Sequence, residues 1–164
     1  MALLQFTTYS DIRAALGVSA EELEDTTLSL SLYEQELAAD LEGVSSTLVD
    51  DFLALPADPD DFSKAQKKFD DAIRLFATYS VANHLTASLP LFSPKEITDG
   101  KAGFSRYAAD PYQKTITAVA AKYEQNRLRL VDAYAALQST TSTPVVRRTF
   151  FSAVAAAYDP VTDT

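Results

Sequence analysis

The residue of this 164-residue chain with the widest catalytic repertoire is His84, its single histidine, in the segment SVANHLTAS. A histidine works as a general base or metal ligand when a nucleophile or further ligands stand beside it. The chain has no second histidine, no cysteine and no G-x-S-x-G nucleophile elbow. A lone histidine inside a predicted helix is more often a packed or capping side chain. We therefore predict no catalytic residue, and a hydrolase that uses His84 stays an alternative to test.

Clustered aspartates and one glycine-containing loop are the remaining candidates for binding an ion or a phosphate. The clusters are Asp50 with Asp51, Asp58 with Asp60 and Asp61, and Asp70 with Asp71. None has the spacing of a calcium-binding loop, and carboxylates at helix starts usually act as caps. In DGKAG (residues 99–103) the lysine precedes the second glycine, unlike the order in a Walker phosphate loop. We expect no metal, no cofactor and no enzymatic activity.

The composition is typical of one globular domain, with 47% apolar and 23% charged residues. The absence of cysteine excludes disulfide scaffolds, thiolate zinc sites and cysteine nucleophiles. The opening, MALLQFTTYSDIR, lacks the basic and apolar regions of a signal peptide. No apolar run approaches the roughly 20 residues of a membrane span, so we expect no membrane contact.

Charge is divided unevenly along the chain, whose net charge is −9. Residues 1–61 contain 14 acids and one base, Arg13, for a net charge of −13. Residues 62–164 contain 9 acids and 13 bases, for a net charge of +4. Opposite faces of neighbouring copies can pair through such charges, or the acids can simply solvate the N-terminal helices. An acidic chain without a concentrated basic face is a poor general binder of nucleic acid.

Local signals predict that the chain begins with a short helix over residues 10–16. Thr8 or Ser10 can cap its start, and Asp11 lies near the positive end of its dipole. Gly17 suits the left-handed residue that closes such a helix.

Three more short helices are expected in the acidic part. Ser19 and Glu22 form an S-x-x-E capping box, which predicts a helix over residues 19–25. The leucine spacing favours a helix over residues 30–41, and another is expected over residues 46–55, ahead of a proline-rich linker.

Two long amphipathic helices come next, over residues 62–89 and from about residue 110 to 138. The apolar stripe of the first is Phe62, Phe69, Ile73, Phe76 and Ser80, widened by Ala72, Leu75, Tyr79 and Leu85. The stripe of the second is Tyr112, Ile116, Val119, Tyr123, Leu130, Tyr134 and Leu137. Long helices of this kind pack antiparallel, with the N-terminal helices covering them. The predicted fold is an all-α bundle, residues 1–138, with an extended C-terminal tail.

The segment between the long helices, residues 89–112, is unusually long and apolar for a connection. TDGKAGFSRYA can form a short helix with Phe104 and Tyr107 on one face beside Arg106. These rings either plug one end of the bundle or, with Lys101, contact a neighbouring subunit.

The composition of the last region, residues 139–164, predicts a linker, STTSTP, followed by an apolar tail. Its candidate docking residues are Val145, Val146, Arg147, Arg148, Phe150, Phe151, Val154 and Tyr158. A disordered terminus does not usually contain so many large apolar groups. The tail therefore docks on another protein or packs back on its own bundle.

Two stretches resemble the head-to-tail adaptor (head-completion or connector) proteins of tailed bacteriophages. The first is YSDIRAALGVSAEELED with the acidic, leucine-rich segment after it. The second is LFSPKEITDGKAGFSRYAADPYQKTI, which leads into AKYEQNRLRLVDAYAAL. The similarity spans roughly residues 8–140 and rests on the pattern of helices, a few turn residues and aromatic positions.

The resemblance implies a structural virion protein, made in the host cytoplasm, that forms a dodecameric ring beneath the portal protein. Such a ring extends the DNA channel, lets DNA pass without sequence-specific binding and provides a platform for tail or nozzle proteins. The resemblance also implies that the C-terminal tail grips the portal. The alternative hypothesis is an acidic DNA mimic or inhibitor, whose N-terminal half occupies the basic groove of a nucleic-acid enzyme.

Overall fold

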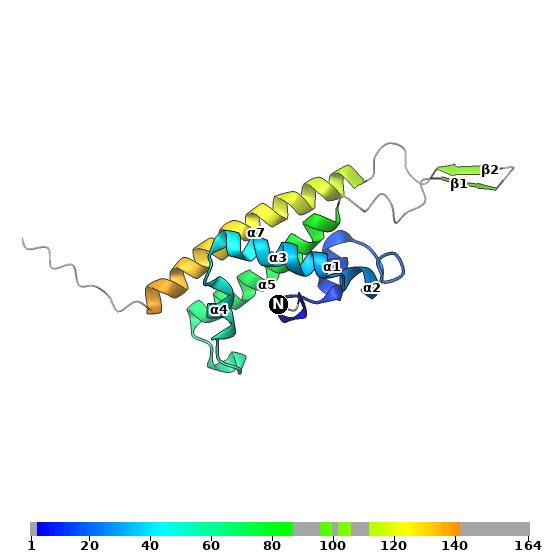
Figure 1. Cartoon of the computed structure of the whole chain (residues 1–164). Coiled ribbons are helices and arrows are strands. Elements are labelled where there is room, and N and C mark those ends of the chain that lie inside the picture. Colours follow the sequence, from blue (N-terminus) through cyan, green and yellow to red (C-terminus); the bar gives the residue numbers. More distant parts are fainter. Residues whose placement is uncertain (1–2, 87–95, 100–101, 106–111, 142–164) are drawn as a thin grey trace, which may run out of the picture.

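The computed structural model describes residues 3–86, 96–99, 102–105 and 112–141. These residues form an all-α bundle and one short β-hairpin, so the predicted fold class is confirmed (Figure 1). The elements in chain order are η1 (Leu3–Gln5), α1 (Tyr9–Leu16), α2 (Asp25–Leu28), α3 (Ser31–Val44), α4 (Leu48–Leu53), η2 (Pro59–Asp61), α5 (Lys64–Leu85), β1 (Glu96–Asp99), β2 (Ala102–Ser105) and α7 (Tyr112–Thr141).

The two long helices, α5 and α7, pack antiparallel against each other, with α7 along one edge of the bundle (Figure 1). A capping box begins α5: the Ser63 hydroxyl accepts from the Gln66 amide and the Gln66 side chain accepts from the Ser63 amide. The helix ends at Leu85, short of the expected residue 89. At the other boundary, α7 continues to Thr141, so Ser139 belongs to this helix and not to a linker.

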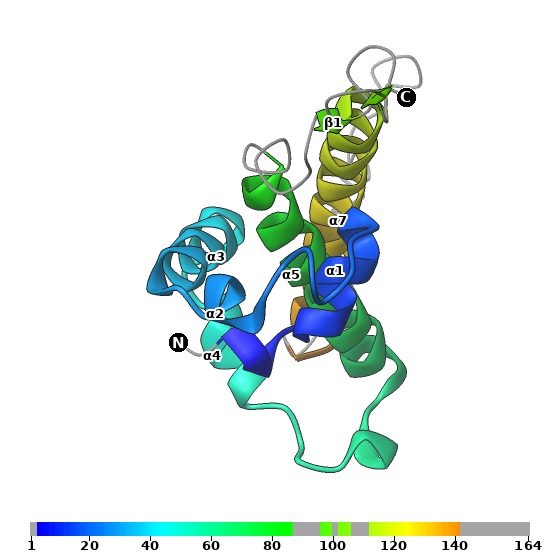
Figure 2. The ribbon, with the colours of Figure 1, turned by 90° about the vertical axis from the view of Figure 1, so that its right-hand side faces the viewer.

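The N-terminal helices pack around α5 in separate positions. Figure 2 shows α3 on one side of α5 and α7 on the other, with α1 beside the α5–α7 pair. The predicted caps of α1 are confirmed, because Thr8 accepts from the Asp11 amide and Gly17 adopts a left-handed φ of 71°. The local sequence thus fixes both ends of this helix.

The predicted helix over residues 19–25 is wrong. Both hydrogen bonds of the Ser19–Glu22 capping box form, but the residues after Ser19 adopt a turn and not a helix. Helix α2 begins only at Asp25. The reason lies in a tertiary contact: the Leu23 carbonyl accepts from Arg13 Nε at 2.7 Å. Arg13 also pairs with Asp25, so this side chain fixes the end of the turn where a longer helix would need to continue.

The later N-terminal helices lie close to their predicted positions. Helix α3 covers Ser31–Val44, so Gly43 lies inside it and Ser45 ends it, a few residues beyond the expected end. Helix α4 covers Leu48–Leu53, within the predicted 46–55.

The short helix expected over TDGKAGFSRYA is also wrong. Residues 96–99 and 102–105 form the antiparallel strands β1 and β2, in which Ile97 pairs with Phe104 and Asp99 with Ala102. Two residues, Gly100 and Lys101, therefore connect the strands. In the sequence, a two-residue spacing that begins with glycine favours a hairpin, and this signal outweighs the helical spacing of the aromatic residues.

Most of the α5 stripe is buried as predicted. Phe69, Ile73, Phe76 and Ser80 are buried, and Phe62 is half-buried. Leu75 departs from the prediction, since 45% of its surface is exposed. Leu75 lines two open surface hollows, one between α1 and α5 and the other between α5 and α7.

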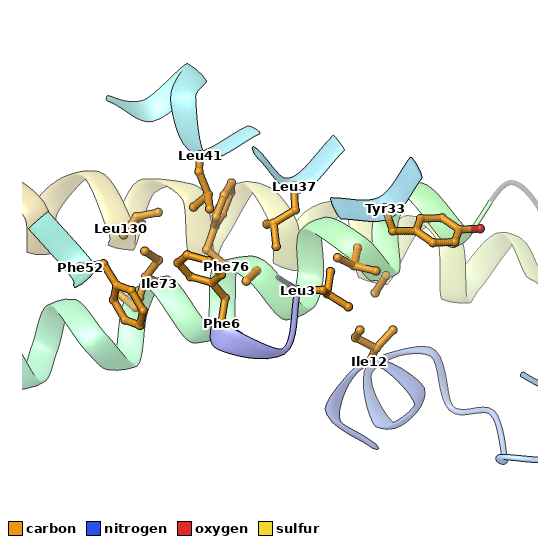
Figure 3. Close-up of a cluster of buried hydrophobic side chains, with 14 of the residues drawn as sticks. Leu3, Phe6, Ile12, Tyr33, Leu37, Leu41, Phe52, Ile73, Phe76 and Leu130 are labelled. Atoms are coloured by element: carbon orange, nitrogen blue, oxygen red, sulfur yellow. The ribbon is translucent and has the colours of Figure 1, made fainter. Parts of the chain in front are cut away.

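Aromatic rings connect the helices through the core (Figure 3). The Phe6 and Phe52 centroids are 4.9 Å apart, and Phe52 lies 6.4 Å from Phe69. Phe69 in turn lies 5.5 Å from Tyr134, which links α4, α5 and α7. A second pair, Phe76 and Tyr123, joins α5 to α7 at 5.5 Å. Such ring pairs add about 0.5–1.5 kcal/mol each beyond area burial.

Candidate functional site

The most connected group of titratable side chains is a polar cluster that joins α3, α5 and α7. Its centre is Asp40 of α3, whose Oδ2 accepts from Ser80 Oγ at 2.6 Å and lies 3.2 Å from His84 Nε2. The hydroxyl of Tyr123, from α7, also donates to Asp40. Three helices therefore meet at one carboxylate, at the edge of the apolar core.

The second ring nitrogen of His84 contacts Glu36 of α3, which completes the polar cluster of Glu36, Asp40, Ser80, His84 and Tyr123. His84 Nδ1 lies 3.1 Å from Glu36 Oε2. Glu36 and Asp40 are one turn apart on α3, and Ser80 and His84 are one turn apart on α5, so two i, i+4 pairs face each other. An ionised carboxylate only accepts, so both contacts are hydrogen bonds when both ring nitrogens carry a proton. His84 is thus held between two carboxylates of α3.

This geometry does not set up a nucleophile. The Ser80 hydroxyl donates to Asp40, and both nitrogens of His84 face carboxylates, so the histidine takes no proton from the serine. Ser80 is also fully buried. The polar cluster instead fixes the position of α3 on α5, because directional hydrogen bonds are satisfied in one register only.

Two tyrosines beside the polar cluster have raised pKa values. Burial is the main cause for Tyr123, and the negative charge of Asp40 and its hydrogen bond raise the pKa further. Burial likewise raises the pKa of Tyr33, with a smaller effect from Glu36. Both phenols therefore stay neutral at physiological pH.

The three aspartate clusters have structural roles. Asp58 caps η2 by accepting from the Asp60 amide at 3.0 Å, and Asp70 pairs with Arg74 at 2.9 Å. Asp51 accepts from Tyr134 and Gln138 and ties α4 to α7. Within the described ranges, no group of His, Cys, Asp or Glu side chains has the arrangement of a metal site.

Two open hollows lie along the exposed side of α5. The larger, about 650 Å³, lies between α1 and α5, and the smaller, about 390 Å³, lies between α5 and α7. Asp71 and Leu75 line both. Their linings mix acidic, basic and apolar side chains, so neither selects a ligand of one charge.

The predicted contact residues fall largely outside the described part of the chain. Phe104 lies in β2 opposite Ile97, and Lys101, Arg106 and Tyr107 lie outside the described residues. The predicted docking tail also lies outside them: Val145, Val146, Arg147, Arg148, Phe150, Phe151, Val154 and Tyr158. The subunit-contact and tail-docking roles of these residues stay predictions.

The polar cluster was missed from the sequence. One signal was present, since Ser80 interrupts an otherwise apolar stripe, and a buried serine needs a hydrogen-bond partner. The identity of that partner, 40 residues away in the chain, depends on the tertiary fold.

Comparisons with known proteins add no family to this description. None of the helices described has both the length and the hydropathy needed to cross a bilayer. A scan of protein families, a search of curated proteins and a search of solved structures each found no match to the chain.

Proposed function

We propose that this chain is a structural protein of a tailed-bacteriophage virion, a head-to-tail adaptor. In this role, copies form a ring beneath the portal, extend the DNA channel and offer a platform to the tail. The proposal starts from the resemblance in residues 8–140 and assigns no catalysis, cofactor or membrane contact. DNA passes through the ring without sequence-specific binding.

The observation that supports the proposal best is the separation of charge between helices. Helix α3 carries four acids and no base, for a net charge of −4. The long helices α5 and α7 each carry four basic and two acidic residues, for a net charge of +2 each with His84 neutral. A small subunit with opposite charges on different helices is suited to repeated contact with its own copies.

The apolar tail is the proposed anchor on the portal. Phe150 and Phe151 supply large rings of the kind that dominate binding at interfaces, and Arg147 and Arg148 supply charge-assisted hydrogen bonds. The β1–β2 hairpin, with Phe104, remains the proposed contact to an adjacent subunit.

The test is to mix the purified protein with the portal from the same source and image the product by electron microscopy. A chain truncated after Pro144 and a Phe150→Ala/Phe151→Ala variant are the matched controls, checked for helicity by circular dichroism. We expect a second ring stacked on the portal with the full chain and none with either variant. A full-length protein that never joins the portal would refute the proposal.

One observation favours the alternative, an acidic DNA mimic. Residues 14–63 contain 13 acids and no base, a charge density that a basic groove can bind. This alternative predicts salt-sensitive binding to a DNA-handling enzyme. If pull-down at low salt recovers no such enzyme, the alternative is excluded.

A further inference from the structure

The exposed side of α5 carries an apolar side chain that the described bundle leaves uncovered. Leu75 belongs to the apolar stripe of this helix, yet 45% of its surface is exposed. It lines both open hollows, the one between α1 and α5 and the one between α5 and α7. Asp71, one turn earlier on α5, lines both as well. The two hollows therefore adjoin along α5, and together they are called the α5 groove.

The walls of the α5 groove carry small side chains, which leaves room beside Leu75. Ala14 and Ala15 line the groove on α1, and Ala133 and Ala136 line it on α7. A concave surface surrounds an apolar group on several sides, whereas a convex helix face, such as that around the exposed Leu128, touches it on one side only. An apolar segment therefore buries more surface in the α5 groove than on the outer face of α7.

Charge does not select the occupant of the α5 groove. Between α5 and α7, the acids Asp71 and Asp132 stand with the bases Lys68 and Arg129, so the charges of the lining are balanced. The occupant is therefore selected by its apolar surface and by its reach.

One apolar segment of the chain starts close to the α5 groove. Helix α7 ends at Thr141, and residues 142–164, which lie outside the described residues, continue from that point. Ala136 lines the groove five residues before this end, which is about 7.5 Å along the helix. The segment contains large apolar side chains, whose exposure to water is unfavourable: Val145, Val146, Phe150, Phe151, Val154 and Tyr158.

The length of this tail is sufficient to reach the exposed leucine. Arg129 lines the same hollow as Leu75 and lies twelve residues, or about 18 Å, before the end of α7. The nine residues from 142 to 150 span up to about 30 Å when they are extended, so Phe150 can return as far as Leu75. A tethered segment has an effective concentration of the order of millimolar, which exceeds that of a free partner in dilute solution. Tethering therefore favours the tail over a second copy or another protein.

We propose that the C-terminal tail packs into the α5 groove of its own chain before the subunit meets a partner, with Phe150 and Phe151 against Leu75. The same two rings are the proposed anchor on the portal, so a packed tail is withheld until the portal displaces it. The withholding rests on the proposed function, whereas the contact within the chain does not.

Thiol labelling tests this contact, because the native chain has no cysteine. Ala136→Cys places a thiol in the α5 groove, and Ala135→Cys places one beside it that lines neither hollow; both alanines are exposed. Each is made in the full-length chain, once with the native tail and once with Phe150→Ala/Phe151→Ala. Circular dichroism checks the helicity of all four chains, which are then labelled with iodoacetamide in dilute solution.

We expect the native tail to slow the labelling of Ala136→Cys about tenfold relative to the double-alanine tail, as for a tail that is docked about nine-tenths of the time. Ala135→Cys should react at the same rate with both tails, because it has the same distance to the tether but lies outside the groove.

Three results would overturn the inference. Equal labelling of Ala136→Cys with both tails means that the tail does not occupy the α5 groove. Equal protection of Ala135→Cys and Ala136→Cys means that the tail lies elsewhere on α7. Protection that disappears on dilution means that the tail of another copy is the occupant, because a contact within one chain does not depend on concentration.

The same chains, mixed with the portal, separate this inference from the proposed function. If Ala136→Cys is never protected but the protein stacks on the portal, the groove contact is wrong and the adaptor role stands. If Ala136→Cys is protected and the protein never joins the portal, the contact stands and the adaptor role falls. If the portal binds and Ala136→Cys then becomes reactive, both stand.

Discussion

Helix α5 makes two contacts that are built in different ways. Toward α7 it presents Phe69 and Phe76, each with a ring 5.5 Å from a tyrosine of α7. Toward α3 it presents Ser80 and His84, both bonded to Asp40. The first contact is mainly apolar and non-directional, and the second depends on directional hydrogen bonds.

The apolar contact mainly determines the stability of the bundle, whereas the polar contact determines where α3 lies on α5. Apolar packing between long helices supplies free energy in proportion to the area buried. The polar cluster adds less free energy, but it holds α3 in one register on α5. Since α3 is the most acidic helix, the polar cluster also fixes where the negative face of the subunit stands.

The largest expected effect comes from breaking the apolar contact. Phe76→Ala removes a fully buried ring beside Tyr123 and should lower the free energy of unfolding by about 3–5 kcal/mol. Leu75→Ala, one position away on the exposed side, should change it by less than about 1 kcal/mol. Urea denaturation monitored by circular dichroism measures both. Equal losses would mean that α5 is not packed as described.

A smaller loss is expected at the polar cluster. Asp40→Ala leaves the donors of Ser80, His84 and Tyr123 without their acceptor, which should cost about 1–3 kcal/mol. Glu42→Ala, on the exposed side of the same helix, should be neutral within about 0.5 kcal/mol. An Asp40→Ala chain as stable as the native protein would show that the polar cluster does not hold α3.

The start of α5 tests a purely local contribution. Ser63→Ala removes one half of the capping box and should cost about 1 kcal/mol, whereas Ser63→Asp keeps an acceptor and should cost much less. The same urea titrations compare the two. If Asp and Ala are equally destabilising, the cap contributes nothing at this position.

The smallest effect at neutral pH concerns Tyr123, whose pKa is raised in the folded state. The unfolded chain then releases the phenolic proton at lower pH than the folded protein does. Stability from this group is fully present below about pH 10, the unfolded value, and is lost as the pH rises through the folded pKa. Tyr123→Phe should therefore show a shallower loss of stability above pH 10 than the native chain. Parallel alkaline curves for the two proteins would contradict the raised pKa.

Local signals predicted the parts of the fold that depend on neighbouring residues. Thr8 and Gly17 end α1 as expected, because caps act within one turn. Ser19 and Glu22 form their box, but Arg13, ten residues before Leu23, holds the next residues in a turn. The aromatic spacing around Phe104 suggested a helix, whereas the two-residue spacing between the strands, which begins with glycine in the sequence, favours the observed hairpin.

The polar cluster marks the limit of prediction from sequence. His84 was correctly placed in a helix, and the stripe position of Ser80 was correct. That both meet Asp40 is a result of the crossing of α3 over α5, which no periodicity encodes. The charge division was visible in the sequence, but the partners of the α3 acids, such as His84 for Glu36 and Asp40, depend on the tertiary fold.

The most direct test of the adaptor account is an electron microscopy reconstruction of the portal mixed with the full-length protein. The account predicts a closed ring of copies stacked beneath the portal. A portal that stays bare at saturating protein would contradict it.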